Sequence, residues 1–204
     1  MKIEYQKFID AIKEISKEIN ENQDWLSELD QSVGDGDHGV NMSRGFNEVA
    51  KLDHTNLSLS NYISLIGRTL MSKVAWSILS FIWNVFYEYS KQYKRKFQSF
   101  TLKELKILVQ NFVNTLTMLG KVKENEKTMF DVWKPLNDYL VNINEINLDI
   151  KNNLINFIFD CAQKTKDMIA TKGRASYLKE RSTGTIDPGS YSSYIILKNI
   201  INNL

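Results

Sequence analysis

Three aspartates stand close together in the segment LDQSVGDGDHGVNMSRGF, which begins at Leu29. Asp35 and Asp37 are separated by a single glycine, and further glycines flank the pair, so the backbone has the freedom to turn both carboxylates toward one point. Asp30 lies just upstream and can close a third side. Three carboxylates brought together repel one another and need a cation. Their hard oxygen atoms suit Mg²⁺ or Ca²⁺ better than zinc, and the set is large enough for two bridged ions.

Other interpretations of this segment are weaker. A solvated Asp-Gly turn between helices is common, but His38 and Asn41 add further ligand-type side chains nearby and favour a metal site. An EF-hand loop starting at Asp35 would need a glycine and a glutamate where the chain has Val40 and Phe46. The sequence also has no Walker A motif and no dinucleotide-binding glycine pattern.

Composition limits the class of protein. The chain has 204 residues, of which 43% are hydrophobic, and we predict one domain covering residues 1–204. Its 26 basic and 24 acidic residues nearly balance, so nothing favours nucleic acid as a partner. The basic cluster of Lys91, Lys94, Arg95 and Lys96 is interpreted as a solvated helix end.

The remaining compositional signals indicate a cytoplasmic protein with no membrane partner. Residues 1–15 carry charges throughout and contain no apolar signal-peptide core. The most apolar run, residues 74–87, is shorter than the roughly 18–20 residues that span a bilayer and predicts a buried helix. The single cysteine, Cys161, is predicted to be a core residue.

The elements that must position the aspartates are helical. With 9 glycines and 2 prolines the chain has few obligatory breaks, and apolar residues recur at helical spacing. Thr101 and Glu104 have capping-box spacing, Gly120 stands where a C-terminal cap belongs, and Pro135 is tolerated near the start of its helix. We expect an all-α protein of about eight helices, with functional residues on loops at one end. The expected helices cover residues 3–19, 25–33, 42–49, 60–92, 101–120, 128–141, 149–171 and 190–202, and an irregular connection covers 173–189.

A family resemblance adds to this prediction. Three blocks, LDQSVGDGDHGVNMSRGF, EKTMFDVWKP and GRASYLKERSTGTIDPGSYSS, resemble DhaL, the nucleotide-binding subunit of bacterial dihydroxyacetone kinase. The same module forms the C-terminal domain of single-chain dihydroxyacetone kinases. The blocks have the family's order and similar spacing, and the resemblance extends over nearly the whole chain.

The resemblance implies an eight-helix antiparallel up-and-down barrel with Mg-nucleotide, ADP or ATP, at one rim. It assigns Asp30, Asp35 and Asp37 as magnesium ligands, with two ions expected. In this assignment Gly120 and Met129 lie against adenine, and Arg174 completes the pocket, as suits a residue that binds phosphate. The implied nucleotide contacts are His38, Gly39, Val40, Asn41, Ile78, Leu79, Gly120, Thr128, Met129, Arg174 and the turn Asp187, Pro188 and Gly189.

The chain departs from the family at two places. Where the family has a glycine-rich phosphate element close to SKVGGASGPL, residues 72–81 read SKVAWSILSF, so Ile78 and Leu79 replace the small residues that approach phosphate. If the helix runs through this stretch, its N–H groups are used in intrahelical bonds. Residues 122–126, VKENE, replace the family's Pro-Gly pair in the lid over adenine.

Two functions follow from the resemblance. The favoured one is a kinase subunit whose bound ADP is rephosphorylated by a DhaM-type phosphotransferase protein, after which the phosphoryl group passes to dihydroxyacetone held on a DhaK-type subunit. The alternative is a non-catalytic regulatory or assembly subunit, which the altered residues 75–80 support. The first is favoured because the other side chains matched to the pocket are all present. The sequence leaves three points open: the acceptor, the phosphoryl donor, which could be a phosphotransferase protein or free ATP, and the oligomeric state, a homodimer included.

Overall fold

The computed structural model describes residues 3–73 and 99–204. The all-α prediction is confirmed, since the described residues form long helices with only one antiparallel pair of two-residue strands, β1 (Ile3–Glu4) and β2 (Ser99–Phe100). The helices are α1 (Tyr5–Glu21), α2 (Gln23–Gln31), α3 (His38–Ala50), α4 (Leu59–Lys73), α6 (Leu102–Thr115), α7 (Phe130–Val141), α8 (Leu148–Lys164) and α9 (Pro188–Asn202).

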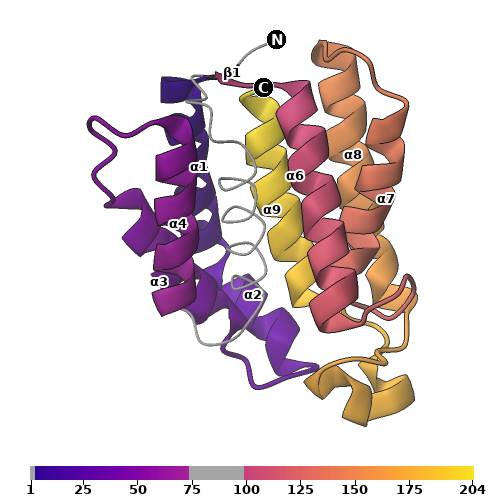
Figure 1. Ribbon diagram of the computed structural model, residues 1–204. Helices are drawn as coiled ribbons and strands as arrows, with labels where there is room; N and C mark the ends of the chain where they lie inside the picture. The colour runs from indigo at the N-terminus through magenta and orange to yellow at the C-terminus, as the bar shows by residue number, and fades with distance from the viewer. Residues whose placement is uncertain (1–2, 74–98) are drawn as a thin grey trace.

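The long helices run alternately up and down, and α9 lies among them (Figure 1). Helix α9 packs against α1, α2, α7 and α8, while α3 packs against α1, α2 and α4. Both termini lie at one end of the bundle. The opposite end carries the turn between α2 and α3, the segment between α6 and α7, and the connection between α8 and α9 (Figure 1). This gathering of connections at one end matches the expected position of the functional residues.

Apolar faces of the helices form the core. On α1, Ile12, Ile15 and Ile19 recur at three- and four-residue spacing and are all buried, as expected for an amphipathic helix that covers a bundle. Cys161 on α8 is also buried and has no disulfide partner, which confirms its prediction as a core residue. None of the described helices combines the length and hydropathy needed to cross a bilayer.

Three sequence predictions fall outside the described residues. These are the buried helix over residues 74–87, the solvated basic cluster at residues 91–96, and the phosphate contacts assigned to Ile78 and Leu79. The expected helix over residues 60–92 is therefore described only as far as Lys73. This helix is one of the eight that the sequence predicts.

The predicted end of α8 at residue 171 is wrong. The helix ends at Lys164 and is followed by a short 3-10 turn, Thr165–Asp167. The Thr165 carbonyl oxygen accepts a hydrogen bond from the Lys127 ammonium at 2.8 Å, and the Thr165 hydroxyl accepts the Asp187 N–H at 3.0 Å. These contacts with distant residues redirect the chain at a point that helical periodicity cannot reveal.

Two further boundaries differ from prediction. Asp187, Pro188 and Gly189 were expected to form a turn, but Asp187 is the N-cap of α9 and Pro188 is its first residue. Proline suits this position because its fixed φ is helical and its missing N–H would have no intrahelical partner. A π-helical turn, Leu116–Gly120, extends α6, and Lys121 rather than Gly120 takes the left-handed conformation that ends it, with φ of 48°.

Candidate functional site

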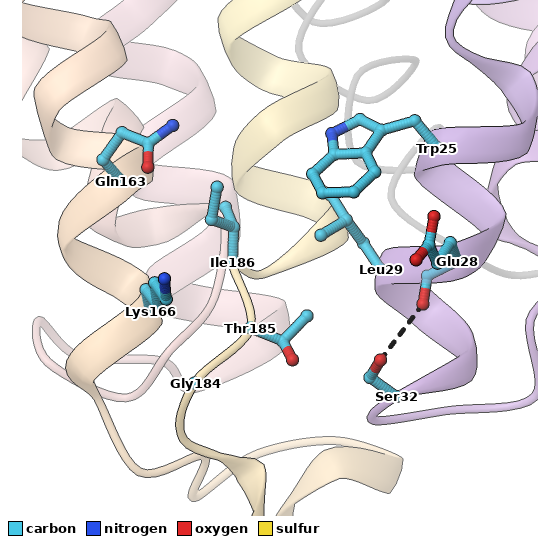
Figure 2. Close-up of a pocket in the computed structure, with 9 residues that line it drawn as sticks. All are labelled: Trp25, Glu28, Leu29, Ser32, Gln163, Lys166, Gly184, Thr185 and Ile186. Atoms are coloured by element: carbon cyan, nitrogen blue, oxygen red, sulfur yellow. Dashed lines mark hydrogen bonds between the residues drawn. The ribbon is translucent and has the colours of Figure 1, made fainter.

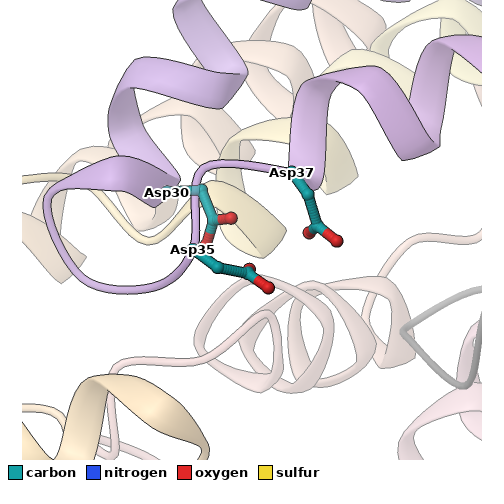
Figure 3. Close-up of side chains that lie close together, drawn as sticks. All are labelled: Asp30, Asp35 and Asp37. Carbon is teal, nitrogen blue, oxygen red and sulfur yellow. The ribbon is translucent and has the colours of Figure 1, made fainter.

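The three aspartates predicted to bind metal lie together at the end of the bundle that carries the connections. Asp30 is near the end of α2, Asp35 is in the following turn and Asp37 is the N-cap of α3. One oxygen atom from each carboxylate lies within 4.8 Å of the others. Figure 3 shows the three side chains grouped around the turn between α2 and α3. Asp30 is half-buried, whereas Asp35 and Asp37 are exposed, so the cluster opens to solvent.

Backbone hydrogen bonds and glycines build the turn that holds the cluster. The Asp30 carbonyl oxygen accepts the N–H groups of Val33 and Gly34, at 3.0 and 2.5 Å, and so turns the chain back at the end of α2. Gly36 has φ of 77°, a left-handed conformation that favours glycine. A Cβ atom at Gly34 would lie 2.4 Å from Oδ1 of Asp30, so the glycine leaves room for that carboxylate.

The donor set fits a hard divalent cation. Magnesium binds oxygen at about 2.0–2.1 Å, so two ligands on opposite sides of one ion are roughly 4 Å apart. The three aspartate oxygen atoms, which lie within 4.8 Å of one another, are close to this spacing. Oδ2 of Asp30 accepts the His38 N–H at 3.2 Å, which orients the carboxylate and leaves Oδ1 available as a ligand.

The structure gives the residues after Asp37 different environments. The His38 ring is buried, with Nε2 3.1 Å from the Ser192 hydroxyl on α9, and burial lowers its pKa to about 4. Its ring therefore links α3 to α9 as a neutral group, while its backbone N–H faces the cluster. Gly39 is buried against α2, since a Cβ there would lie 1.9 Å from the Gln23 carbonyl oxygen. Val40 is exposed, and Asn41 is half-buried and accepts a hydrogen bond from Arg44.

Arg174 meets the aspartate cluster from the connection between α8 and α9. It begins a stretch of 3-10 turns, Arg174–Ser182, and its guanidinium forms an ion pair with Asp35. Both side chains are largely exposed. The sequence predicted Arg174 as part of a phosphate pocket, and the structure brings it to one carboxylate of the aspartate cluster.

The predicted nucleotide contacts at residues 128, 129 and 187–189 form a second group. The Ser190 hydroxyl donates to the Thr128 carbonyl oxygen at 3.0 Å, and Asp187 accepts the Ser190 N–H at 2.7 Å. Met129, the residue that follows Thr128, is buried. Burial raises the pKa of Asp187 to about 6. Gly120, half-buried at the end of the π-helical turn, has no hydrogen bond to this group among the described contacts.

Helix α9 joins the two groups. Ser192 contacts His38, next to the aspartate cluster, and Ser190 contacts Thr128, so the first turns of α9 connect the cluster with the second group of predicted residues. Ser193 accepts the indole N–H of Trp133 at 2.9 Å, and this hydrogen bond links α7 to α9. These serines lie in the third block of family resemblance, but nothing in the sequence indicated a role for them.

Sequence reasoning also missed two buried charged residues, Lys127 and Asp131. Asp131 accepts the N–H groups of Thr128 and Asn125 at 2.9 and 2.5 Å. Burial raises the pKa of Asp131. The spacing of Thr128 and Asp131 resembles a capping box and could have indicated this contact. No local pattern could have indicated the partners of Lys127, which lie far along the chain.

A cavity of about 370 Å³ lies between α2 and the stretch that precedes α9. Figure 2 shows Trp25, Leu29, Glu28 and Ser32 on one side of it and Gln163, Lys166 and Ile186 on the other. None of the three clustered aspartates lines this cavity, so the cavity is distinct from the aspartate cluster.

Known proteins resemble this chain over most of its length. The DAK2 domain family matches residues 32–202. The chain is 35% identical over 188 residues to the ADP-binding subunit DhaL of PEP-dependent dihydroxyacetone kinase 1 from Listeria innocua, covering 91% of this chain and 89% of that protein. It is 34% identical to the ADP-binding subunit DhaL of PTS-dependent dihydroxyacetone kinase from Lactococcus lactis, covering 95% and 94%.

A solved structure shares the fold. The dihydroxyacetone kinase of C. freundii matches with a TM-score of 0.68 and 20% sequence identity, over 96% of this chain. The match covers 34% of the C. freundii chain, so this protein spans about a third of that kinase. The same kinase has been solved in complex with AMP-PNP and Mg²⁺. At this identity the comparison establishes the fold and nothing further.

Proposed function

The chain belongs to the DAK2-domain family of DhaL-type subunits, and we propose that it is the ADP- and ATP-binding subunit of a multi-subunit dihydroxyacetone kinase. The observation that carries this proposal is the convergence of Asp30, Asp35 and Asp37 on a shared space, with oxygen atoms within 4.8 Å. These are the residues that the family resemblance assigns to magnesium. The relatives with similar sequences are named as ADP-binding subunits.

In this proposal the aspartates hold two magnesium ions. When bound, the metal would neutralise phosphate oxygens of the nucleotide and orient them for transfer. Arg174, at the edge of the cluster, supplies a permanent positive charge on the side where phosphates would project. The backbone of residues 38–41 starts α3 beside the cluster, and a helix start favours negative charge.

The base of the nucleotide would lie along residues 120–129 and the start of α9. Met129, which is 5% exposed, would support this wall of the pocket from behind as an adaptable apolar side chain, and the hydrogen bond from Ser190 to Thr128 fixes the adjoining backbone. The two halves of the pocket are held in register by Ser190 and Ser192 on the same helix. Correct spacing between base and phosphates is what a nucleotide site requires.

No side chain of this chain needs to act as a nucleophile. We propose that a DhaM-type phosphotransferase protein transfers a phosphoryl group to bound ADP. The ATP so formed then passes its terminal phosphoryl group to a hydroxyl oxygen of dihydroxyacetone held on a DhaK-type subunit, regenerating ADP. Catalysis by this chain consists of positioning and charge stabilisation, as is usual for phosphoryl transfer.

Exposed apolar side chains near the site support docking of such partners. Met118, Leu119 and Tyr177 are 75%, 58% and 84% exposed, and Val40 is 49% exposed. They come from the π-helical turn, the 3-10 segment and α3, which meet at the end of the bundle that carries the aspartates (Figure 1). Exposed apolar side chains at this end of the bundle would suit contact with a partner protein.

The alternative function is a non-catalytic regulatory or assembly subunit. It is favoured by the replacement of the family's glycines at residues 75–80, a stretch outside the described residues. It predicts an intact partner surface and metal loop without phosphoryl transfer.

Reconstitution separates the two functions. The purified chain, loaded with ADP and Mg²⁺, is mixed with a DhaK-type subunit carrying dihydroxyacetone and with a phosphorylated DhaM-type protein. A kinase subunit yields dihydroxyacetone phosphate, and Asp35→Asn abolishes the product. Asp160→Asn, which changes an exposed carboxylate on α8, serves as the matched control and should retain the rate. Absence of product from the unaltered chain, with DhaK binding retained, would support the non-catalytic subunit.

A further inference from the structure

Lys127 is a buried lysine inside the second block of family resemblance. Its side chain has 2% of its surface exposed, and its ammonium donates hydrogen bonds to two carbonyl oxygens, those of Thr165 and Thr185. The Thr165 contact is 2.8 Å long. The two acceptors come from the end of α8 and from the stretch before α9, so a single ammonium joins three separate parts of the chain.

The segment that contains Lys127 has an unusual backbone. Lys121, Asn125 and Lys127 all have positive φ, at 48°, 65° and 58°. Residues other than glycine adopt this conformation only when their surroundings hold them there. The hydrogen bonds of Asp131 to the N–H groups of Asn125 and Thr128 hold the segment from the side of α7. Lys127 holds it from the side of α8 and α9.

The contacts of Lys127 continue into the start of α9. Thr165, whose carbonyl Lys127 binds, accepts the Asp187 N–H through its hydroxyl at 3.0 Å. Asp187 is the N-cap of α9 and accepts the Ser190 N–H. The Ser190 hydroxyl donates to the carbonyl oxygen of Thr128, the residue after Lys127. These contacts form a closed ring of hydrogen bonds. The ring fixes the backbone at residues 127 and 128 directly before Met129.

Two nearby carboxylates favour the charged form of the buried Lys127 ammonium. Burial lowers the pKa of Lys127, while Asp187 and Asp167 act in the opposite direction. A neutral side chain of similar length would fill the space but would remove the ammonium donor from both carbonyl oxygens, leaving the Thr165 carbonyl with only the Met168 N–H at 3.2 Å, and such a loss is costly.

We infer that Lys127 is a positioning residue for the base-side wall of the nucleotide pocket, holding Thr128 and Met129 against the start of α9. The inference rests on the proposed function, because it concerns the same nucleotide site. Lys127 touches neither the phosphates nor the metal cluster in this assignment. It acts through the backbone of the residues that follow it.

The test compares the binding of two ligands, ADP and Mn²⁺, to the 204-residue chain. Lys127→Met removes the ammonium, and Lys123→Met, an exposed lysine in the same segment, is the matched control. ADP affinity is measured by calorimetry in excess Mg²⁺, and Mn²⁺ affinity is measured separately without nucleotide. We expect Lys127→Met to weaken ADP binding by about tenfold while Mn²⁺ affinity stays within about twofold. Lys123→Met should leave both unchanged.

Two results would overturn the inference. ADP affinity unchanged in Lys127→Met would show that the ammonium does not position the base side. Equal losses of ADP and Mn²⁺ affinity in a folded variant would show a general structural role. If Lys127→Met does not fold, Ser190→Ala tests the same ring, and it should weaken ADP severalfold with Mn²⁺ binding retained; unchanged ADP affinity in that variant overturns the inference. Failure of the unaltered chain to bind ADP is a different result, which would refute the proposed function itself.

Discussion

Arg174 and Asp35 form an ion pair that connects the 3-10 segment before α9 to the turn between α2 and α3. Asp35 is also one of the three carboxylates that converge at the predicted metal site. The guanidinium therefore lies where a divalent cation would compete with it. Both side chains are largely exposed, so the pair itself contributes little to the free energy of unfolding.

Removal of Arg174 should raise the affinity of the cluster for a metal alone. In Arg174→Ala the competing charge is gone, and Mn²⁺ affinity without nucleotide should rise about two- to fivefold, as expected for an exposed pair worth at most about 1 kcal/mol. ADP affinity in Mg²⁺ should fall, because a phosphate partner is lost. Arg181→Ala removes the same charge from an exposed residue of the same segment and is the control. Mn²⁺ affinity that falls or stays constant in Arg174→Ala would contradict this account.

Gly34→Ala should weaken metal binding without unfolding the protein. The added Cβ would lie 2.4 Å from Oδ1 of Asp30, and the carboxylate would have to rotate away from the cluster. The closest atoms belong to the Asp30 side chain, and the Asp30 carbonyl oxygen, 3.2 Å from the added Cβ, need shift only slightly. Stability should therefore fall little, whereas Mn²⁺ affinity should fall about tenfold or more. Isothermal titration measures the affinity and chemical denaturation the stability. Ser32→Ala in the same turn is the control, and retained Mn²⁺ affinity in Gly34→Ala would argue against Asp30 as a ligand.

Gly39→Ala should destabilise the fold, although alanine is normally the better helix former. A Cβ at residue 39 would lie 1.9 Å from the Gln23 carbonyl oxygen, so α2 and α3 would have to separate. Overpacking of this kind typically costs about 1–3 kcal/mol. The urea midpoint should therefore fall in Gly39→Ala and change little in Val40→Ala, whose side chain is 49% exposed. An unchanged midpoint in Gly39→Ala would mean that the two helices are not in close contact.

The pH dependence of stability should report the buried carboxylate of Asp187. Burial raises its pKa in the folded protein to about 6, above its ordinary value of 3.8. The folded state therefore holds the proton more tightly, and the resulting stability is present below pH 4 and is lost as pH rises through 6. Asn at this position still accepts the N-cap hydrogen bond but cannot titrate.

The comparison of the unaltered chain with Asp187→Asn isolates this effect. Between pH 5 and pH 7 the unfolding free energy of the unaltered chain should fall by about 1 kcal/mol relative to that of the variant. Urea denaturation at the two pH values measures the difference, and contributions from His38 and other groups cancel. A constant difference between the two proteins would show that the Asp187 carboxylate titrates normally.

Features encoded by neighbouring residues were predictable from the sequence. The apolar spacing in α1 and the close succession of Asp30, Asp35 and Asp37 are both local patterns, and the helix and the cluster were found where expected. The contact of Glu104 with the Thr101 N–H, at 3.1 Å, likewise follows from three-residue spacing. Local spacing carried these predictions because the interacting groups lie within a few residues of one another.

Contacts between distant residues were not predictable in this way. His38 was predicted as a nucleotide contact, and nothing in its neighbourhood indicated that its ring contacts Ser192, a residue near the other end of the sequence. The turn that follows α8 contacts Lys127, whose ammonium donates to carbonyl oxygens of two segments far along the chain. Such partners become evident only when the helices are packed. The resemblance indicated which blocks matter, while the structure indicates which side chains hold those blocks together.

We propose that Asp30, Asp35 and Asp37 bind Mg-nucleotide, and calorimetric titration of the nucleotide-free chain with ADP tests this most directly. We expect binding at micromolar concentration or tighter in Mg²⁺, loss of binding with a chelator, and loss of binding in Asp35→Asn. ADP binding that is undetectable in Mg²⁺, or that is equally strong in Asp35→Asn, would contradict the proposal.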